Sequence, residues 1–480
     1  MQNISWLKEV LKRKDDLIND LQGLLQIKSV LNEENATGEA PFGNGIKEAL
    51  QYVLSLGEQA GFETKNIDNM AGHIEIGRGK NLIGVLCHID VVPEGDGWEV
   101  DPYGGIVKDG KIYARGAIDD KGPTIAAYYA MKIVKELGLP LKSRVRLVIG
   151  TDEENDWRCV DHYFKHEEMP LLGFAPDADF PIIYAEKGIA DFDLIFPPKG
   201  SDGEEEDDAL LSFEAGRAYN MVPDFAKAIL SMNTEQTDMI QRFAFFLKDH
   251  DYDGCCFVDD GYFVFELHGV SAHGSEPGKG INAGLQLIRF LAKLDLNKQS
   301  SAFIQFAQKY LLENTDGKAF GIDYQDDITG KLTINVGKIA YQVKDGGRFG
   351  INLRYPVTFD FEEGKKKIAE IIREKNGSLQ VIYESPPHHV NKNDVMIQTL
   401  QKVYEEQTGE KAELLSIGGG TYARALQSGV AFGPLFPGRP DVAHQKNEYI
   451  FIDDLLKATA LYAQAIYELA TLEDHILENK

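Results

Sequence analysis

The stretch Asn81-Leu82-Ile83-Gly84-Val85-Leu86-Cys87-His88-Ile89-Asp90 is a short, nearly all-apolar run that ends in a histidine and an acid. A run of this length with so few polar residues is typical of a β-strand that is buried on both faces of a sheet. Val145 to Ile149 is a second run of this kind. We therefore expect two buried strands, with His88 at the end of the first.

A helix is expected between these two strands. Pro123 suits a first helical position, and an apolar stripe at helical spacing follows it as far as Gly138. The resulting β-α-β pattern predicts an open α/β sheet, which places ligands beyond the carboxyl ends of its strands. His88 and the pair Glu153-Glu154 both follow such ends, so we expect them to meet at one edge of the sheet.

The acids and histidines at this edge have the composition of a two-metal hydrolase site. His88 and Asp90 point to the same side of an extended segment, where the carboxylate can orient the imidazole. Asp119 precedes a helix start, and its two oxygens could bridge metals roughly 3.5 Å apart. In the doublet Glu153-Glu154, one acid can bind metal while its neighbour takes a proton from metal-bound water.

Two later segments supply the remaining candidate ligands. Asp177 follows Pro176, and His444 lies in the segment Asp441 to Gln445. A mixture of imidazole and carboxylate without thiolate suits zinc, manganese or cobalt and does not choose among them.

Each of these residues also has an ordinary structural interpretation. The Glu153-Glu154 pair alone would be a solvated turn, and Asp119-Asp120 alone would be a helix N-cap. Asp179 is an alternative to Asp177 as the candidate metal ligand in this segment. His162 and His166 have the i, i+4 spacing of a helical metal pair, but His162 is not followed by the glutamate of the metalloprotease motif, so we expect a solvent-facing helix there.

Composition limits the function classes. The chain has 480 residues and a formal net charge of -26, which favours two or three domains and disfavours binding to nucleic acid or an anionic membrane surface. Met1 to Leu25 alternates charged and apolar residues, predicting an amphipathic helix rather than a secretory signal. No segment has the 18 apolar residues of a spanning helix, and the four cysteines form no disulfide framework. We expect a cytoplasmic enzyme with reduced thiols.

The pattern changes in the middle of the chain, past Gly188. The acidic run within Ser201 to Asp208 is expected to be a solvated loop. Strands are then expected at Tyr262–His268, Lys331–Val336 and Phe349–Tyr355, and helices at Asn282–Leu294 and Glu362–Lys375. After Pro386-Pro387 the alternating strand and helix pattern of the first part returns. Helices are expected at Asp394–Thr408 and Asp453–Leu472, and a strand at Val430–Phe436. The middle therefore looks like an α+β insertion in an α/β domain.

Short segments along the whole chain can be compared with those of known families. They are His88-Ile89-Asp90, Arg115 to Pro123, Thr151 to Glu154, Pro176-Asp177, Asn220 to Pro223, Ala272-His273-Gly274, Asn352 to Pro356, Gly418 to Tyr422 and Ala443-His444-Gln445. Together they resemble the M20 metallopeptidase family, and within it the PepV type of bacterial dipeptidase. They occur in family order and run nearly from end to end of the chain.

The resemblance implies a role for each matching residue. His88 and Asp177 would hold one metal, Glu154 and His444 the second, and Asp119 would bridge them, with a cis peptide between Asp119 and Asp120. Asp90 would orient His88, Glu153 would be the general base, and His273 would stabilise the oxyanion. Arg354 would bind the substrate carboxylate, assisted by Asn220 and by the Gly418 to Thr421 loop with Gly419. Arg354 could instead form a structural ion pair, and His273 could be an ordinary loop histidine.

The resemblance also implies an architecture and an activity. The expected fold is an α/β catalytic domain with a central sheet flanked by helices, formed by residues 1–186 and 387–480, with an α+β two-part lid inserted at 187–386. Hinges are expected near Gly188 and Pro386. A lid of this size favours a monomer, because it can supply His273 within one chain. The implied reaction is hydrolysis of dipeptides with free amino and carboxyl ends, with two divalent metal ions, zinc first and manganese or cobalt as alternatives.

Two other functions remain open at this point. The first is a deacylase that cleaves N-acyl amino acids with the same metals. The second is a metal-binding or peptide-binding protein without catalysis, although mere binding needs no general base such as Glu153.

Overall fold

The computed structural model describes residues 4–198 and 208–477 of the chain. Contacts between residues divide the chain into two compact units. Unit 1 consists of residues 1–184, 389–415 and 420–480, and unit 2 consists of residues 185–388 and 416–419. The acidic run expected to be a loop lies outside the described residues, apart from Asp208.

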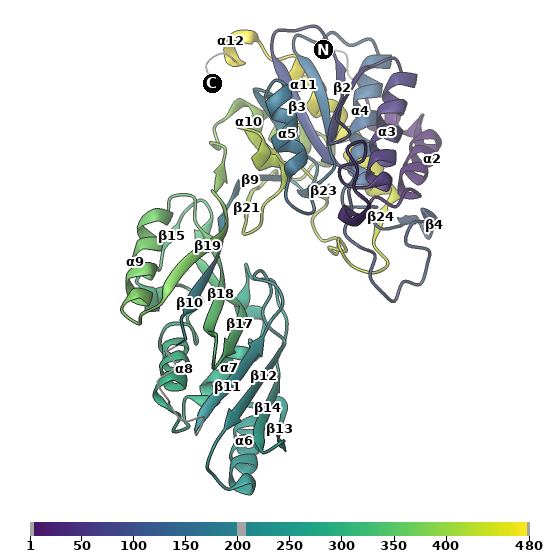
Figure 1. Cartoon of the computed structure of the whole chain (residues 1–480). Helices are drawn as coiled ribbons and strands as arrows, with labels where there is room; N and C mark the ends of the chain where they lie inside the picture. Colours follow the sequence, from purple (N-terminus) through teal and green to yellow (C-terminus); the bar gives the residue numbers. More distant parts are fainter. Residues whose placement is uncertain (1–3, 199–207, 478–480) are drawn as a thin grey trace. The chain divides into compact units, whose positions relative to one another are not determined.

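Unit 1 is built on a mixed sheet with the strand order β1-β2-β6-β3-β7-β22-β9-β20, in which β21 also pairs with β9 (Figure 1). The four strands β6, β3, β7 and β22 are parallel to one another, whereas β2 and β9 run antiparallel to their neighbours in this group. The strand bounds are β1 Glu63–Ile67, β2 Ala71–Ile76, β3 Leu82–His88, β6 Arg144–Gly150, β7 Leu172–Ala175, β9 Ile182–Glu186, β20 His388–His389, β21 Leu414–Ile417 and β22 Gly429–Ala431.

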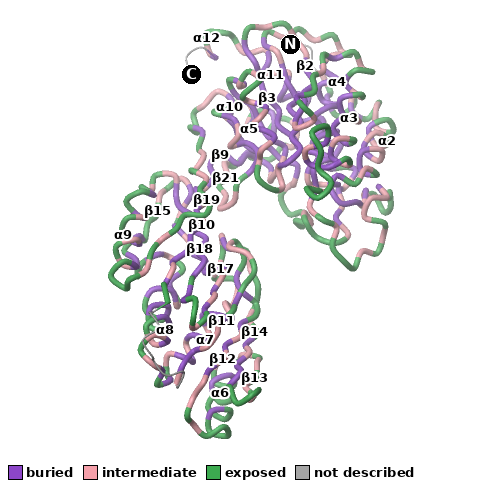
Figure 2. The backbone as a smooth tube through the Cα atoms, viewed as in Figure 1, coloured by how far each residue is buried: buried purple, intermediate pink, exposed green. Residues whose placement is uncertain are grey.

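Helices surround this sheet. The bounds are α1 Trp6–Leu11, α2 Lys14–Leu25, α3 Asn44–Gln59, α4 Lys121–Glu136, α5 Arg158–His166, α10 Val395–Thr408, α11 Ile452–Ala470 and α12 Asp474–Leu477. Helices α4 and α11 pack on each other and against β3 and β6, and α5 packs against β2. All of β3 (Figure 2) and nearly all of β6 are buried, as their apolar runs predict, and β7 is buried as well.

Short elements complete the described parts of unit 1. They are the strands β4 Ile106–Lys108, β5 Lys111–Tyr113, β8 Ala178–Asp179, β23 Pro434–Leu435 and β24 Tyr449–Phe451, and the 3-10 helices η1 Glu33–Asn35 and η4 Tyr422–Ala425. Strand β24 pairs with β5, and β23 pairs with β8. These pairings join the C-terminal part of the chain to the segments that precede α4 and follow β7.

Unit 2 contains an eight-stranded antiparallel sheet in the order β13-β14-β12-β11-β17-β18-β10-β19. Its bounds are β10 Gly188–Phe196, β11 Ala209–Ala215, β12 Phe225–Ser231, β13 Asp253–Asp259, β14 Tyr262–His268, β17 Thr333–Gln342, β18 Gly346–Tyr355 and β19 Ser378–Ser385. The helices are α6 Gln236–His250, α7 Ala283–Leu291, α8 Lys298–Tyr310 and α9 Phe361–Arg373, with η2 Pro277–Lys279, η3 Lys318–Phe320 and the small strands β15 Gln325–Asp326 and β16 Gly330–Lys331. A core rich in phenylalanine fills this unit.

The predicted α/β fold is confirmed, and two local expectations were wrong. The expected N-terminal helix is broken into α1 and α2, because the chain turns at Lys12 and Arg13, and Arg13 does not continue the helical backbone. The strand expected at Val430–Phe436 is two short strands, β22 and β23. A cis peptide between Gly433 and Pro434 separates them, and proline cannot donate the hydrogen bond that a continuous strand requires.

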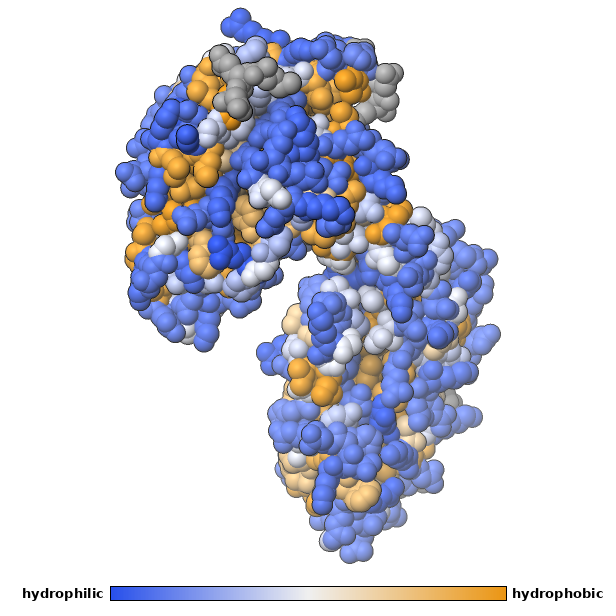
Figure 3. Space-filling model, turned by 180° about the vertical axis from the view of Figure 1, so that it is seen from behind, coloured by the Kyte–Doolittle hydropathy of each residue, from blue (hydrophilic) through white to orange (hydrophobic). Residues whose placement is uncertain are grey.

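The face drawn in Figure 3 is largely hydrophilic, with polar side chains between its apolar patches. Within residues 4–198 and 208–477, every helix is too short or too polar to cross a membrane.

Candidate metal centre

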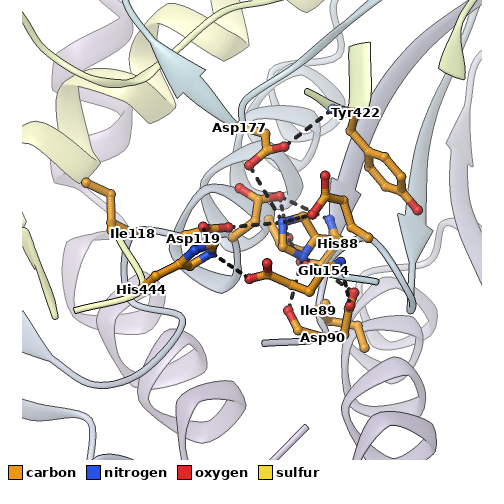
Figure 4. A network of polar contacts seen from close by, with 12 residues as sticks. His88, Ile89, Asp90, Ile118, Asp119, Glu154, Asp177, Tyr422 and His444 are labelled. Atoms are coloured by element: carbon orange, nitrogen blue, oxygen red, sulfur yellow. Dashed lines mark hydrogen bonds and ion pairs between the residues drawn. The ribbon is translucent and has the colours of Figure 1, made fainter. Parts of the chain in front are cut away.

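Three neighbouring parallel strands bring the candidate ligands to one edge of the sheet in unit 1. His88 is the last residue of β3, Glu153 and Glu154 follow β6, and Asp177 follows β7. Because parallel strands end at the same edge, their C-terminal residues converge there. Figure 4 shows Asp177, Glu154 and Asp119 turned toward the imidazole of His88 or of His444.

Two further segments complete the cluster. Asp119 lies just before α4, and its peptide bond to Asp120 is cis, as the family resemblance implies. His444 comes from the loop between β23 and β24 and has a positive φ of 61°, which is uncommon for a residue with a side chain. Both lie beside the strand ends although they are far apart in the sequence.

The ligand atoms form two groups that meet at Asp119. His88 Nε2 lies 3.1 Å from Asp119 Oδ1 and 3.6 Å from Asp177 Oδ1. His444 Nε2 lies 2.9 Å from Asp119 Oδ2 and 3.1 Å from Glu154 Oε1. Asp119 therefore presents one oxygen to each histidine, which is the arrangement required of a bridging carboxylate.

Asp90 fixes the tautomer of His88, mainly through its main chain. His88 Nδ1 lies 3.1 Å from the carbonyl oxygen of Asp90 and 3.5 Å from its Oδ1. A carbonyl can only accept, so Nδ1 carries the proton and Nε2 keeps its lone pair. The carboxylate of Asp90 has a second task, since its Oδ2 accepts a hydrogen bond from the amide of Glu154 at 3.0 Å. Asp90 thus connects both groups of ligands.

Metal ions fit this set of donors. Within the described chain, the buried Nε2 atom of His88 has no well-aligned hydrogen bond, and its lone pair faces the carboxylate oxygens of Asp119, Asp177 and Glu153. Lone pairs directed at carboxylates repel unless a cation or proton lies between them. Two groups of three residues each offer ligand atoms that lie within 4.8 Å of one another. The first group is His88, Glu153 and Asp177, and the second is Asp119, Glu154 and His444.

Electrostatics of the protein alone indicate the same need for positive charge. Burial, followed by the charge of Asp119, raises the pKa of Glu154 to about 7. Burial and then the charge of Asp177 raise the pKa of Glu153 well above its usual value. Burial would also raise the pKa of Asp119, but the neighbouring imidazoles of His444 and His88 outweigh it and lower that pKa. The hydrogen bonds to Asp119 and Glu154 raise the pKa of His444 to about 11.

The alternative acid Asp179 is not part of either group. It lies in β8, and burial followed by the charge of Asp441 raises its pKa. The metal groups contain Asp177 instead. Asp177, which directly follows Pro176, is therefore the acid that lies close to the other candidate ligands.

Sequence reasoning gave no role to three buried residues that contact the candidate ligands or lie next to them. The amide of Tyr422 donates to Asp177 Oδ2 at 3.4 Å, and its ring packs edge-on against the imidazole of His88, with centroids 5.9 Å apart (Figure 4). Arg115 and Glu448 form an ion pair next to Asp119. Arg115 and Tyr422 belong to segments of the family resemblance, whereas Glu448 had no sequence signal beyond its place four residues after His444.

A second cluster of predicted residues lies within unit 2. Asn220 accepts a hydrogen bond from the amide of Gly274 at 2.7 Å, which holds it beside His273. Arg354, at 5% exposure in β18, donates through Nε to Asn352 Oδ1 and through Nη1 to the carbonyl of Gly418, both at 2.9 Å. Gly419 belongs to unit 2, whereas Thr421 belongs to unit 1 and caps η4 through its side chain.

Comparisons with known proteins agree with these observations. The family described as "Peptidase family M20/M25/M40" matches residues 84–468. A protein of Bacillus subtilis (strain 168) named "Putative dipeptidase YtjP" is 52% identical over 467 residues, which cover 97% of this chain and 100% of that protein. A Staphylococcus epidermidis (strain ATCC 12228 / FDA PCI 1200) protein named "Putative dipeptidase" is 48% identical over 464 residues, with coverage of 97% and 99%.

Solved structures share the fold. Human carnosine dipeptidase 1 aligns with a TM-score of 0.56 at 15% identity, covering 97% of this chain and 98% of that one. The di-peptidase Dug1p from Saccharomyces cerevisiae aligns with a TM-score of 0.55 at 15% identity, with the same coverage. At this level of identity, the likeness concerns the fold alone.

Proposed function

Because the chain belongs to the peptidase family M20/M25/M40, we propose that it is a dipeptidase whose site holds two divalent metal ions. The observation that carries this proposal is the position of Asp119, which presents one oxygen to His88 and the other to His444. Dipeptides are the proposed substrates because relatives that match nearly the whole chain are named for them.

The chain would hold the two ions with imidazoles and carboxylates. His88 and Asp177 would bind one ion, Glu154 and His444 the other, and Asp119 both. Zinc is the first candidate for this donor set, and manganese or cobalt would also suit it. When bound, the ions would lower the pKa of the attacking water and polarise the scissile carbonyl.

Glu153 is the proposed general base. Its Oε2 lies 3.9 Å from His88 Nε2, so its carboxylate borders the first ligand group. Burial and the charge of Asp177 raise its pKa, and a more basic carboxylate accepts a proton from water more readily. The same proton would then pass from Glu153 to the leaving amine, which completes hydrolysis of the peptide bond.

His273 is proposed to stabilise the oxyanion. The amide of Ser275 donates to His273 Nδ1 at 3.3 Å, so Nδ1 is the acceptor and Nε2 carries the proton. Burial and then the positive charge of Arg354 lower the pKa of His273, which keeps the ring neutral at physiological pH. A neutral ring with its proton on Nε2 can donate a hydrogen bond to developing negative charge.

The substrate's carboxylate would be bound by Arg354. Its guanidinium is held by Asn352 and Gly418, and a fixed guanidinium can form paired hydrogen bonds to a carboxylate. Asn220, Gly419 and Thr421 are proposed to assist. Recognition of both free ends would limit the length of the substrate.

Domain roles and assembly extend the proposal. Residues 1–186 and 387–480 would form the catalytic domain, and 187–386 a lid of the PepV type whose movement at hinges near Gly188 and Pro386 governs turnover. A phosphinate dipeptide analogue should therefore change the domain orientation of an initially open state, and an unchanged orientation would contradict the hinge proposal. We propose a monomer, because a lid of this size can supply His273 within one chain. The cytoplasm is the proposed location, because the four cysteines are expected to be reduced thiols.

The decisive experiment compares three substrate classes. Chelator-stripped protein, with and without added zinc or manganese, is incubated with free dipeptides, the corresponding N-acetylated amino acids, and tripeptides, and released amino acids are quantified. We expect metal-restored cleavage of dipeptides alone. Faster release from N-acetylated amino acids would establish the deacylase instead. Stoichiometric binding of metal and dipeptide without product would establish a binding protein.

A further inference from the structure

A cluster of metal-ligating side chains lies in unit 1 apart from the candidate centre. Asp68 occupies the turn between β1 and β2 with a positive φ of 54°. His162 and His166 lie one helical turn apart on α5, which packs against β2. Sequence spacing alone identifies only the two histidines, because Asp68 comes from a distant segment.

Neighbouring contacts hold the helix and the hairpin together. Tyr163 Oη lies 2.8 Å from His73 Nδ1 on β2. Glu167, just after α5, pairs with Lys65 of β1 and with Arg146 of β6. The two elements that carry the cluster are therefore fixed to each other by other residues, so the three side chains need no large movement to bind one ligand.

The three side chains lie close enough together to be candidate ligands of one ion. His162 Nε2 lies 2.8 Å from Asp68 Oδ2, and the rings of His162 and His166 have centroids 4.4 Å apart. Each residue offers one ligand atom within 4.8 Å of the other two. Adjacent ligands of a tetrahedral zinc ion are about 3.3 Å apart, so side-chain rotation that brings the three atoms to this spacing would complete coordination.

The hydrogen bond of His166 prepares its ring for a metal. His166 Nδ1 lies 2.9 Å from the carbonyl oxygen of His162, and a carbonyl accepts, so Nδ1 carries the proton. Nε2 of His166 therefore keeps its lone pair. Metal-binding histidines usually donate their second ring N–H to an acceptor of this kind.

An ordinary ion pair between His162 and Asp68 accounts for only part of this arrangement. Such a pair needs no second imidazole, yet His166 lies against the ring of His162 in the tautomer that can bind a cation. Two imidazoles and one carboxylate form a donor set that prefers zinc and similar divalent ions over magnesium or calcium. The side chains of Asp68 and His166 are exposed, so water can reach the coordination position that the three residues leave open on the ion.

We propose that Asp68, His162 and His166 form a further, peripheral binding site for a zinc-like divalent cation. It connects the β1–β2 turn to α5, the helix that begins four residues after Glu154. A cation bound only by the folded protein stabilises it by mass action. This site is independent of the proposed peptidase activity, because none of its residues belongs to the two groups that meet at Asp119.

Metal stoichiometry tests the proposal directly. Untagged, chelator-stripped protein is dialysed against micromolar free zinc, and bound zinc is measured by mass spectrometry. His162→Asn and His166→Asn should each bind one equivalent less than the wild type. The matched control is His250→Asn, since His250 also lies at a helix end with Nδ1 bonded to the carbonyl four residues earlier, at 3.0 Å. It should bind as much zinc as the wild type.

Equal zinc content in the wild type and in both cluster variants would overturn the proposal, and so would an equal loss in His250→Asn. A structural measurement keeps the test valid if a variant folds poorly. Wild-type crystals soaked in zinc should show anomalous scattering between Asp68, His162 and His166. Zinc scattering confined to the candidate centre around Asp119 would contradict the proposed site.

Discussion

Arg115 and Glu448 form a buried ion pair, with Arg115 Nη1 2.7 Å from Glu448 Oε2. The other oxygen of Glu448 accepts hydrogen bonds from the amides of Ile118 and Asp119, at 3.0 and 3.3 Å. The guanidinium also donates to the carbonyl of His444, at 3.4 Å. One ion pair therefore connects the segment that contains Asp119 to the loop that carries His444.

Glu448→Gln should destabilise the fold and weaken metal binding together. The substitution leaves the Arg115 charge buried without its partner, which costs about 3–5 kcal/mol of unfolding free energy. Loss of support behind Asp119 and His444 should lower metal affinity about 10- to 100-fold. Denaturant unfolding and metal titration measure the two effects. The control Glu99→Gln removes an exposed carboxylate and should change neither; an unaltered metal affinity in Glu448→Gln would contradict the supporting role.

Gly150→Ala should displace the tyrosine that packs on His88. A Cβ at Gly150 would lie 1.9 Å from Tyr422 Oη, closer than atoms can approach. Because the Tyr422 ring is fully buried between His88 and Trp157, the core must shift, at a cost of about 1–3 kcal/mol. Metal affinity should fall with stability. Gly38→Ala, where a Cβ meets nothing within 4 Å, is the matched control. Equal melting temperatures for the two variants would refute this packing argument.

Protein stability should depend on pH through His73. Burial, followed by the charge of Arg146, lowers the pKa of His73 to about 4, while Glu167 acts in the opposite direction and Lys65 in the same one. The unfolded chain binds a proton near the usual pKa of about 6.5, but the folded chain does not. The contribution of neutral His73 to the unfolding free energy is therefore fully present above about pH 6.5. It is lost as the pH falls toward 4, by up to about 3 kcal/mol.

The measurement is the unfolding free energy of metal-free protein from pH 7 to pH 4.5. His73→Gln should lose less stability across this range than the wild type. Parallel curves for the two proteins would exclude the contribution of His73.

Arg354→Lys tests the proposed binding of the substrate carboxylate. Lysine keeps the charge but cannot form paired hydrogen bonds, so KM for dipeptides should rise about 10-fold or more. For dipeptide amides, which lack the carboxylate, the substitution should change KM little. Arg348→Lys, on the same strand but half exposed at 53%, is the control. A proportional loss for dipeptides and their amides would indicate that Arg354 has a structural role instead.

Local sequence patterns predicted the parts of the site that depend on strand ends. His88 ends one strand and Glu154 follows another, both with apolar runs that are visible in the sequence, and a parallel sheet brings such ends together. Residue types also made Asp119, Asp177 and His444 candidate ligands, but only the resemblance assigned each of them to one metal or to both. Residue patterns could not reveal that Glu448 accepts hydrogen bonds from the amides of Ile118 and Asp119. These hydrogen bonds join segments that are 330 and 329 residues apart.

The peripheral cluster shows the same limit. His162 and His166 are visible as an i, i+4 pair, but the third ligand, Asp68, is brought there by the hairpin turn and by the packing of α5 on β2. Helical periodicity describes neighbours on one helix and contains no information about a turn that precedes it by roughly ninety residues. Tertiary packing, rather than the motif, therefore determines the candidate site.

The most direct test of the proposed two-metal peptidase is to measure dipeptide turnover and metal content together in Glu153→Gln. The substitution removes the proposed base but none of the proposed ligands, so bound metal should equal that of the wild type while kcat falls by about 10²–10⁴. Asp156→Asn, an exposed acid in the same loop, is the control and should retain activity. Full metal content with turnover lost only in Glu153→Gln is the predicted result, and wild-type turnover in Glu153→Gln, or turnover that persists in fully metal-free protein, would contradict the account.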